Sequence, residues 1–171
     1  MTDLPTPRHP GRYRIALVCL GNICRSAMAD TVLTAALADA GLDDRVEVVS
    51  SGTGGWHVGD PMDRRAAATL TAHGYDASQH RAKQFEPSWH DEADVVLAMD
   101  ATNHSDLRDL APAPVDTGRL LMFRDFDPRA TDEDRDVPDP YFGDDDGFQH
   151  VMGIVERTCA ELVRRLAVVL A

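Results

Sequence analysis

Residues 13–26 read Tyr13-Arg-Ile-Ala-Leu-Val-Cys-Leu-Gly-Asn-Ile-Cys-Arg-Ser26, and they predict a buried strand that passes through a short loop into a helix. The apolar run is short, contains β-branched residues and stops at Gly21-Asn22, which is typical of a strand rather than a helix. The sequence then predicts a helix over 26–40, followed directly by a glycine, and a second strand over 46–50. A strand, a helix and a strand in this order imply a right-handed parallel crossover.

The rest of the chain continues the alternation of strands and helices. The later predicted elements are a helix that begins at an Asp60-Pro61 cap and ends at Gly74, a strand over 94–99, a helix capped by Asp100, a weaker strand over 119–123, and a last helix from Phe148 to Val169. This pattern is typical of an α/β fold, and we expect one three-layer domain over 12–171 in which helices flank a central, mostly four-stranded parallel sheet. Residues 1–11 contain three prolines and no apolar run, so we expect a flexible N-terminal extension.

Composition limits the kinds of partner. The 171 residues carry 17 Lys and Arg against 29 Asp and Glu, and this net charge of −12 repels phosphate backbones, so we expect no nucleic-acid partner. Cys19, Cys24 and Cys159 are too few for a disulfide-stapled scaffold, and neither they nor the seven His have the spacing of a structural metal site. With no signal-peptide core and no membrane-spanning run, we expect a cytoplasmic protein, although export without a signal is compatible with the sequence.

The loop after the first strand has the composition of a phosphate site. Ligands of parallel sheets bind at the carboxyl ends of strands, beside helix N-termini. Gly21 and Asn22 tolerate a left-handed backbone, so that consecutive N–H groups can point inward, and Arg25 offers a planar fork for two phosphate oxygens. In this positive field Cys19 is expected to be a thiolate with Ser26 as a donor to its sulfur, which makes it a nucleophile aimed at a bound phosphoryl group.

Taken singly, these residues have plainer explanations. An isolated Cys19 is more often a small buried hydrophobe, and an isolated Arg25 a solvated residue at a helix start. The Gly-Asn turn, the serine and the strand-to-helix setting together favour the phosphate site. A nucleotide-binding Walker loop is excluded because the loop contains no Gly-Lys-Ser/Thr.

Six short motifs extend this pattern from about residue 12 to the C-terminus. They are Val18-Cys-Leu-Gly-Asn-Ile-Cys-Arg-Ser26, Ser51-Gly-Thr, Trp56-His-Val-Gly59, Leu97-Ala-Met-Asp100, Phe126-Asp-Pro128 and Asp139-Pro-Tyr-Phe-Gly143. In order and spacing they resemble the low-molecular-weight protein tyrosine phosphatases, and the Trp-His-Val-Gly stretch is most similar to the bacterial, actinobacterial-type members. The resemblance implies a hydrolase without cofactor or metal that acts on phosphotyrosine-containing proteins.

The resemblance also implies a role for each matching residue. Cys19 attacks phosphorus and forms a phosphocysteine, while Arg25 stabilises the equatorial oxygens. Asp139, stiffened by a proline on each side, is the general acid and then the base for the hydrolytic water. The residues implied to hold the phosphate are Leu20, Gly21, Asn22, Ile23, Cys24, Arg25 and Ser26.

Substrate walls and supporting residues follow from the same resemblance. The walls of the cleft are implied to be Trp56, His57, Tyr141 and Phe142. Aromatic walls make a deep slot that suits a phosphotyrosine ring. Asn22 is implied to be strained and held by hydrogen bonds from Ser50 and His80.

The two remaining cysteines are expected to differ. Cys24 follows the nucleophile by five residues and is implied to trap oxidised Cys19 as a reversible disulfide. Cys159 lies on the apolar stripe of the last helix, which indicates a core position. Two residues depart from the family: Ala27 replaces a usual Pro at the helix start, and Phe142 replaces a common second Tyr.

Three other functions share parts of this site. An arsenate reductase of the same fold needs a distant redox cysteine pair, yet the chain has no cysteine between Cys24 and Cys159. A protein-arginine phosphatase carries Thr where Ile23 stands, and an aliphatic side chain suits an aryl ring better than a guanidinium. A phosphopeptide-binding module without turnover needs neither Asp139 nor an activated thiolate. We therefore expect phosphotyrosine hydrolysis by a monomer.

Overall fold

Four parallel strands form the centre of the molecule. They are β1 (Tyr13–Cys19), β2 (Val46–Gly52), β3 (Val95–Ala98) and β4 (Leu120–Met122), in the spatial order β2-β1-β3-β4. The computed structural model describes residues 2–111 and 117–171. The prediction of a four-stranded parallel sheet is confirmed, and the strands run within a residue or two of the predicted ranges.

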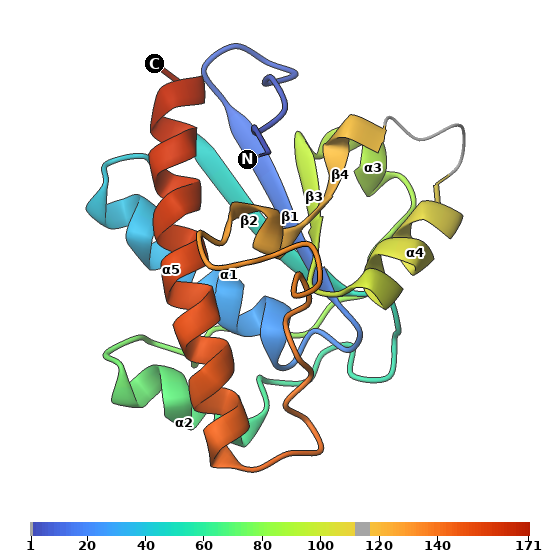
Figure 1. Cartoon of the computed structure of the whole chain (residues 1–171), viewed down its shortest axis with the longest axis vertical. Coiled ribbons are helices and arrows are strands. Elements are labelled where there is room, and N and C mark those ends of the chain that lie inside the picture. The colour runs from blue at the N-terminus through green and yellow to red at the C-terminus, as the bar shows by residue number, and fades with distance from the viewer. Residues whose placement is uncertain (1, 112–116) are drawn as a thin grey trace.

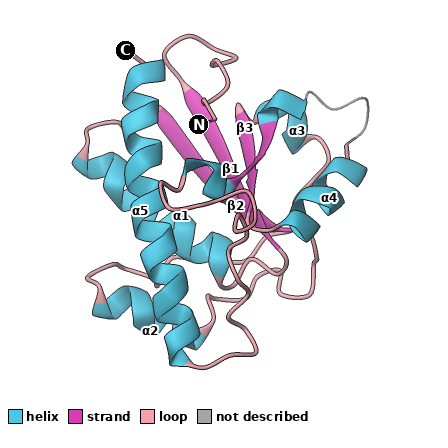
Figure 2. Cartoon of the chain, in the orientation of Figure 1, coloured by secondary structure: helices cyan, strands magenta, loops and turns pink. Residues whose placement is uncertain are grey.

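Helices cover both faces of this sheet (Figures 1 and 2). They are α1 (Arg25–Asp39), α2 (Arg64–Ala72), α3 (Trp89–Glu92), α4 (Ala101–Asp109) and α5 (Asp145–Val169), with short 3-10 turns η1 (Thr117–Arg119) and η2 (Phe123–Phe126). The helices α1, α2 and α5 lie on one side, and α3 and α4 on the other. The three-layer α/β architecture is therefore as expected.

The continuous apolar run of β1 is explained by burial on both faces. Ile15 and Leu17 belong to the larger core, which α1 and α5 cover, whereas Ala16 and Val18 belong to the smaller core beneath α4. A strand that is buried on both sides gains nothing from alternating polar residues.

The long C-terminal helix follows its predicted apolar stripe. Side chains at steps of three and four are fully buried, namely Phe148, Val151, Val155, Cys159, Leu162 and Leu166. The core assignment of Cys159 is confirmed.

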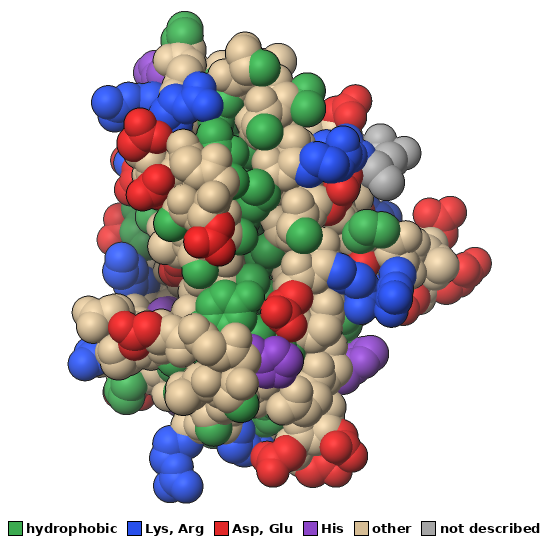
Figure 3. All heavy atoms as spheres, turned by 90° about the vertical axis from the view of Figure 1, so that its left-hand side faces the viewer, with side chains coloured by type: hydrophobic (Ala, Val, Ile, Leu, Met, Phe, Trp, Pro, Cys, Tyr) green, Lys and Arg blue, Asp and Glu red, His purple; other side chains and the backbone are tan. Residues whose placement is uncertain are grey.

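On the face that α1, α2 and α5 present, acidic and basic side chains are interspersed around apolar ones (Figure 3).

The strand order defines where a ligand binds. From β1 the chain crosses to β2 on one side, whereas β3 pairs with β1 on the other, so the connections diverge at the carboxyl ends of β1 and β3. Such a switch point opens a crevice between the loops that follow the two strands. The loop after β1 is residues 20–24, the predicted phosphate site.

The start of α2 differs from the prediction. Asp63, rather than Asp60, caps this helix, because its carboxylate accepts from the N–H groups of Arg65 (2.8 Å) and Ala66 (3.3 Å). Asp60 belongs to an extended connection whose carbonyl accepts from Ala82 N–H at 2.9 Å. A long-range backbone contact thus overrides the local Asp-Pro signal, and Gly74, with φ of 89°, follows the helix as predicted.

The N-terminal segment also differs from the expected free extension. Its described part lies against the domain: Leu4 joins the core, the Tyr13 hydroxyl donates to the Pro5 carbonyl at 2.8 Å, and Arg8 N–H donates to Asp94 at 2.6 Å. Met1 lies outside the described residues. The segment packs because Asp94, at the amino end of β3, offers a buried acceptor that a composition-based prediction does not register.

We predict that Asp94→Ala lowers the free energy of unfolding by about 1–3 kcal/mol, since it leaves the N–H groups of Arg8 and Arg14, both 2.6 Å from the carboxylate, without their acceptor. Urea unfolding followed by circular dichroism measures the change. The control is Asp91→Ala, in which the lost carboxylate is exposed. Equal stability of the two variants would contradict the prediction.

Candidate active site

The loop between β1 and α1 curls around a buried asparagine. Asn22 is fully buried and is the residue other than glycine that adopts a positive φ, 59°, within the described ranges 2–111 and 117–171. Asparagine tolerates this left-handed conformation better than most residues do. The turn directs the Asn22 N–H at the Cys19 sulfur.

Cys19 lies at the floor of the loop with donors directed at its sulfur. Its Sγ is 3.3 Å from the N–H of Asn22 and 3.0 Å from the Ser26 hydroxyl. The Ser26 Oγ in turn accepts from the Asn22 amide at 2.8 Å and lies 3.3 Å from the Ser51 carbonyl. The Ser26 hydroxyl therefore lies beside the Cys19 sulfur, where the sequence predicted it.

The conformation of Asn22 is fixed by two further contacts. Lys83 N–H donates to its side-chain oxygen at 2.9 Å, and His80 Nε2 lies 2.6 Å from its carbonyl. His80 therefore lies where it was predicted. Ser50 does not: its hydroxyl donates to Asp30 on α1 at 2.8 Å, because its side chain points away from the loop, toward α1.

The segment after β2 supports the loop from the other side. Thr53 N–H donates to the Cys19 carbonyl at 3.0 Å, and Gly54 N–H to the Leu20 carbonyl at 2.9 Å. A Cβ on Gly52 would lie 2.5 Å from the Leu20 carbonyl oxygen, which is too close for any other residue. The glycine of the Ser-Gly-Thr motif is thus required by this close approach.

Arg25, the first residue of α1, is buried with an exposure of 3% and reaches into the same space. Its Nη1 donates to Asp100 at 2.6 Å and to the Val137 carbonyl at 3.1 Å, and its Nη2 is 3.5 Å from Asp139. Burial by itself lowers the pKa of Arg25, but the negative charges of Cys19, Asp100 and Asp139 outweigh this effect. The net result is a pKa above the usual value of an arginine. The guanidinium is a fixed cation at the switch point.

Asp100 has a second role that the sequence did not indicate. One carboxylate oxygen caps α4 by accepting from Asn103 N–H at 2.7 Å, as predicted, and the other binds Arg25. A cap residue directly after β3 faces the β1 loop because the two strands are neighbours. The sequence pattern alone identified only the cap.

Asp139 lies at the edge of the site, with its side chain 41% exposed. Its Oδ1 accepts from Tyr141 N–H at 3.1 Å. Arg65 of α2 holds the following turn by donating to the carbonyls of Tyr141 (2.7 Å) and Gly143 (3.1 Å). Sequence analysis missed Arg65, since nothing local relates it to residues more than seventy positions away.

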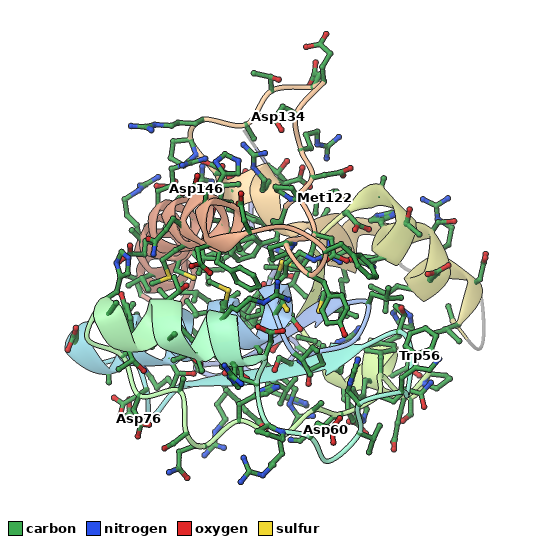
Figure 4. The ribbon with its side chains drawn as sticks, turned by 90° about the horizontal axis from the view of Figure 1, so that it is seen from below. Trp56, Asp60, Asp76, Met122, Asp134 and Asp146 are labelled. Atoms are coloured by element: carbon green, nitrogen blue, oxygen red, sulfur yellow. The ribbon has the colours of Figure 1, made fainter. Side chains whose placement is uncertain are left out.

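A cavity of about 170 Å³ joins these groups. Its lining consists of Cys19, Leu20, Gly21, Ile23, Cys24, Arg25, Trp56, His57, Asp139, Tyr141 and Phe142. Trp56 and Phe142 form exposed parts of the rim, at 73% and 93% exposure, so they are available to a bound molecule. The structure thus brings all four predicted wall residues to the cavity that contains Cys19. In the view from below, Trp56 and Asp60 lie on the opposite side of the molecule from Asp134 (Figure 4).

Cys24 lines this cavity as well. The thiols of Cys19 and Cys24 are both free and buried. Burial, reinforced by Asp63, Cys19 and Asp139, raises the pKa of Cys24.

Within residues 2–111 and 117–171, no three His, Cys, Asp or Glu side chains are placed to hold a metal ion together. Among the same residues no helix is long and apolar enough to cross a membrane.

Comparison with known proteins agrees with the site. Residues 14–169 match the family described as "Low molecular weight phosphotyrosine protein phosphatase". A "Low molecular weight protein-tyrosine-phosphatase" of Streptomyces coelicolor is 46% identical over 151 residues, which cover 88% of this chain and 92% of the relative. "Low molecular weight protein-tyrosine phosphatase A" of Mycobacterium tuberculosis is 44% identical over 142 residues, covering 83% and 84%.

The solved structures agree in fold. YfkJ from Bacillus subtilis superposes with a TM-score of 0.84 and 31% identity, covering 94% of this chain and 98% of that one. The chain belongs to the low-molecular-weight protein tyrosine phosphatases, and it is a hydrolase of that family. The predicted resemblance to actinobacterial members is confirmed by the Streptomyces relative.

We predict that Asn22→Ala lowers the rate of phosphate-ester hydrolysis by about tenfold to a hundredfold, because it removes the bonds to Ser26 and Lys83 that shape the loop. Asn22→Gly retains the positive φ and is expected to fold more stably than Asn22→Ala while remaining impaired. Steady-state kinetics and thermal melts measure the two effects. Ser50→Ala is the control, since its hydroxyl binds Asp30. An equal loss in that variant would contradict our assignment.

We predict that His80 makes stability depend on pH. Burial lowers the pKa of His80 below its usual 6.5, outweighing the opposite effects of the Asn22 carbonyl and Asp30. The unfolded chain therefore binds more protons at this position, so the stabilisation is complete above the unfolded value and is lost as the pH falls through the folded one. Urea unfolding at about pH 7.5 and about pH 5.5 should show a larger loss for wild type than for His80→Gln. Parallel losses would contradict the prediction.

Proposed function

We propose that this phosphatase hydrolyses phosphotyrosine in proteins through a phosphocysteine intermediate. The observation that carries the proposal is the convergence of Cys19, Arg25 and Asp139 on one cavity. A nucleophile, a phosphate-binding cation and a proton donor are the three parts that a cysteine-based phosphoryl transfer requires.

In the first step Cys19 Sγ attacks phosphorus, and the bond to the phenolic oxygen breaks. Arg25 and the N–H groups of residues 20–25 stabilise the equatorial oxygens, whose charge grows in the transition state. Because Asp100 and Val137 occupy Nη1 of Arg25, its orientation is set before substrate binds. Asp139 protonates the leaving phenolate.

In the second step water attacks the phosphocysteine. Asp139, now a carboxylate, accepts a proton from this water, and Cys19 leaves as a thiolate stabilised by Ser26 and the Asn22 N–H. Inorganic phosphate is the product. The partial exposure of Asp139 suits a group that exchanges protons with incoming water.

Phosphotyrosine is favoured as substrate by the shape and lining of the cavity. The aromatic side chains of Trp56, Tyr141 and Phe142 line the cavity together with the aliphatic Ile23. A long aryl phosphate reaches Cys19 from this rim, whereas a short phosphoserine leaves the rim unfilled. A monomeric state, a cytoplasmic location and the absence of nucleic-acid partners remain predictions of the sequence.

The Cys19–Cys24 disulfide likewise remains a prediction. Peroxide would convert the Cys19 thiolate to a sulfenic acid, and Cys24 would displace water from it. The raised pKa of Cys24 keeps it a thiol at neutral pH, which slows this second reaction.

The test is phosphate release from matched phosphotyrosine and phosphoarginine peptides, in reducing buffer without metal, with wild type and Cys19→Ser side by side. We expect release from phosphotyrosine, a loss of about 10³-fold or more in Cys19→Ser, and a phosphorylated Cys19 peptide by mass spectrometry after acid quench. Preference for phosphoarginine would overturn the role given to Ile23. Tight binding without release would replace the hydrolase with a binding module.

A further inference from the structure

Arg124, in η2, is a buried arginine outside the cavity that contacts the segment leading to Asp139. Its side chain is 3% exposed, close to the value for Arg25. Its Nη1 donates to the Asp134 carboxylate at 2.7 Å and to the Asp136 carbonyl at 2.9 Å. No sequence motif pointed to this residue.

Arg124 is itself held in place by Asp127. Its Nε donates to Asp127 at 2.9 Å, and Arg157 of α5 donates to both oxygens of the same carboxylate at 2.7 and 3.0 Å. Burial raises the pKa of Asp127, but hydrogen bonds from Arg157, the Arg129 N–H and Arg124 outweigh it and lower the pKa. The carboxylate is therefore charged, and it anchors Arg124 to α5.

Two arginines donate hydrogen bonds to consecutive carbonyls of the loop that leads to Asp139. The Asp136 carbonyl accepts from Arg124, and the next carbonyl, of Val137, accepts from Arg25 at 3.1 Å. Two contacts with the connection from β3 to α4 complete the attachment: Val137 N–H donates to the Met99 carbonyl at 2.7 Å, and the N–H of Ala101, the first residue of α4, donates to the Asp136 side chain at 3.0 Å.

These hydrogen bonds end at Val137, one residue before Asp139. Pro138 alone separates Val137 from Asp139, and proline fixes its own φ and restricts the residue before it. A displacement of the peptides at 136 and 137 therefore displaces Asp139 as well, because the backbone between them has little freedom to rotate. In contrast, Asp134 lies on the outlying part of the loop (Figure 4).

We propose that Arg124 is a positioning residue that sets the distance of Asp139 from the leaving group. The proposal rests on the role of Asp139 under the proposed function. Arg124 touches neither substrate nor reacting atoms; it acts through the Asp136 and Val137 peptides. Its loss allows the loop to move and leaves Arg25 with a less constrained carbonyl partner.

The test is the leaving-group dependence of kcat/KM for Arg124→Gln on a series of aryl phosphates. Proton donation matters most when the leaving phenol is weakly acidic, so a misplaced acid harms poor leaving groups selectively. We expect kcat/KM on phenyl phosphate to fall by about tenfold to a hundredfold, and on p-nitrophenyl phosphate by less than about threefold. The ratio of the two rates in one preparation is unaffected by any unfolded fraction.

Two further variants make the result decisive. Arg135→Gln removes an equal charge from the same loop, from a side chain that binds Asp125 at its exposed end, and is expected to leave the ratio unchanged. In an Asp139→Asn background, Arg124→Gln is expected to add no further selectivity, since the acid is already lost.

The outcomes separate the two proposals. If Asp139→Asn steepens the dependence but Arg124→Gln does not, the positioning role is wrong while the function stands. An equal effect of Arg135→Gln, or an additive effect in the Asp139→Asn background, overturns it as well. If Asp139→Asn itself leaves the dependence unchanged, the role of Asp139 in the proposed function fails.

Discussion

The burial of the Arg25 guanidinium is the constraint on which the rest of this molecule depends. A cation with almost no access to water is costly unless its environment supplies charge and acceptors. Here Asp100 at the end of β3, the Val137 carbonyl and Asp139 supply them, at 2.6, 3.1 and 3.5 Å. Because β3 lies beside β1, Asp100 after β3 can neutralise Arg25 at the start of α1, the helix that follows β1. The sheet order is thus what makes the buried cation tolerable.

The loop around Cys19 is held by contacts from distant segments. Asn22 adopts its left-handed conformation only because Lys83 N–H, His80 and Ser26 satisfy its polar groups. Gly52 allows the segment after β2 to approach the loop backbone. A local sequence of this kind could form many turns in isolation. The domain selects one, in which the Asn22 N–H and the Ser26 hydroxyl lie within hydrogen-bonding distance of Cys19 Sγ before any substrate arrives.

Sequence reasoning predicted the elements whose signals are local. The apolar run of β1 and the three-and-four spacing of α5 gave the right sheet and the right core, and the family motifs brought the cavity residues together. It misplaced the α2 cap at Asp60 and assigned Ser50 to Asn22, because each position is set by a partner distant in the sequence: the Asp60 carbonyl accepts from Ala82 N–H, and the Ser50 hydroxyl donates to the Asp30 side chain. Arg65 and Arg124 were missed for the same reason: each holds carbonyls, which carry no sequence signature.

Electrostatic balance in the cavity links binding to proton transfer. In the free enzyme Asp139 contributes to neutralising Arg25, which it approaches at 3.5 Å from a partly exposed position. Under the proposed roles, a bound phosphoryl dianion takes over the arginine and brings two negative charges toward the same carboxylate. Asp139 is then free of Arg25 and, under these roles, donates its proton to the leaving phenolate. After the phenol departs, the Cys19 thiolate has been used up in the S–P bond and the acid has given up its proton, so Asp139 is a carboxylate when water enters. Under the proposed roles the same residue therefore serves both steps from one place at the edge of the cavity, as donor to the phenolate and then as acceptor from water.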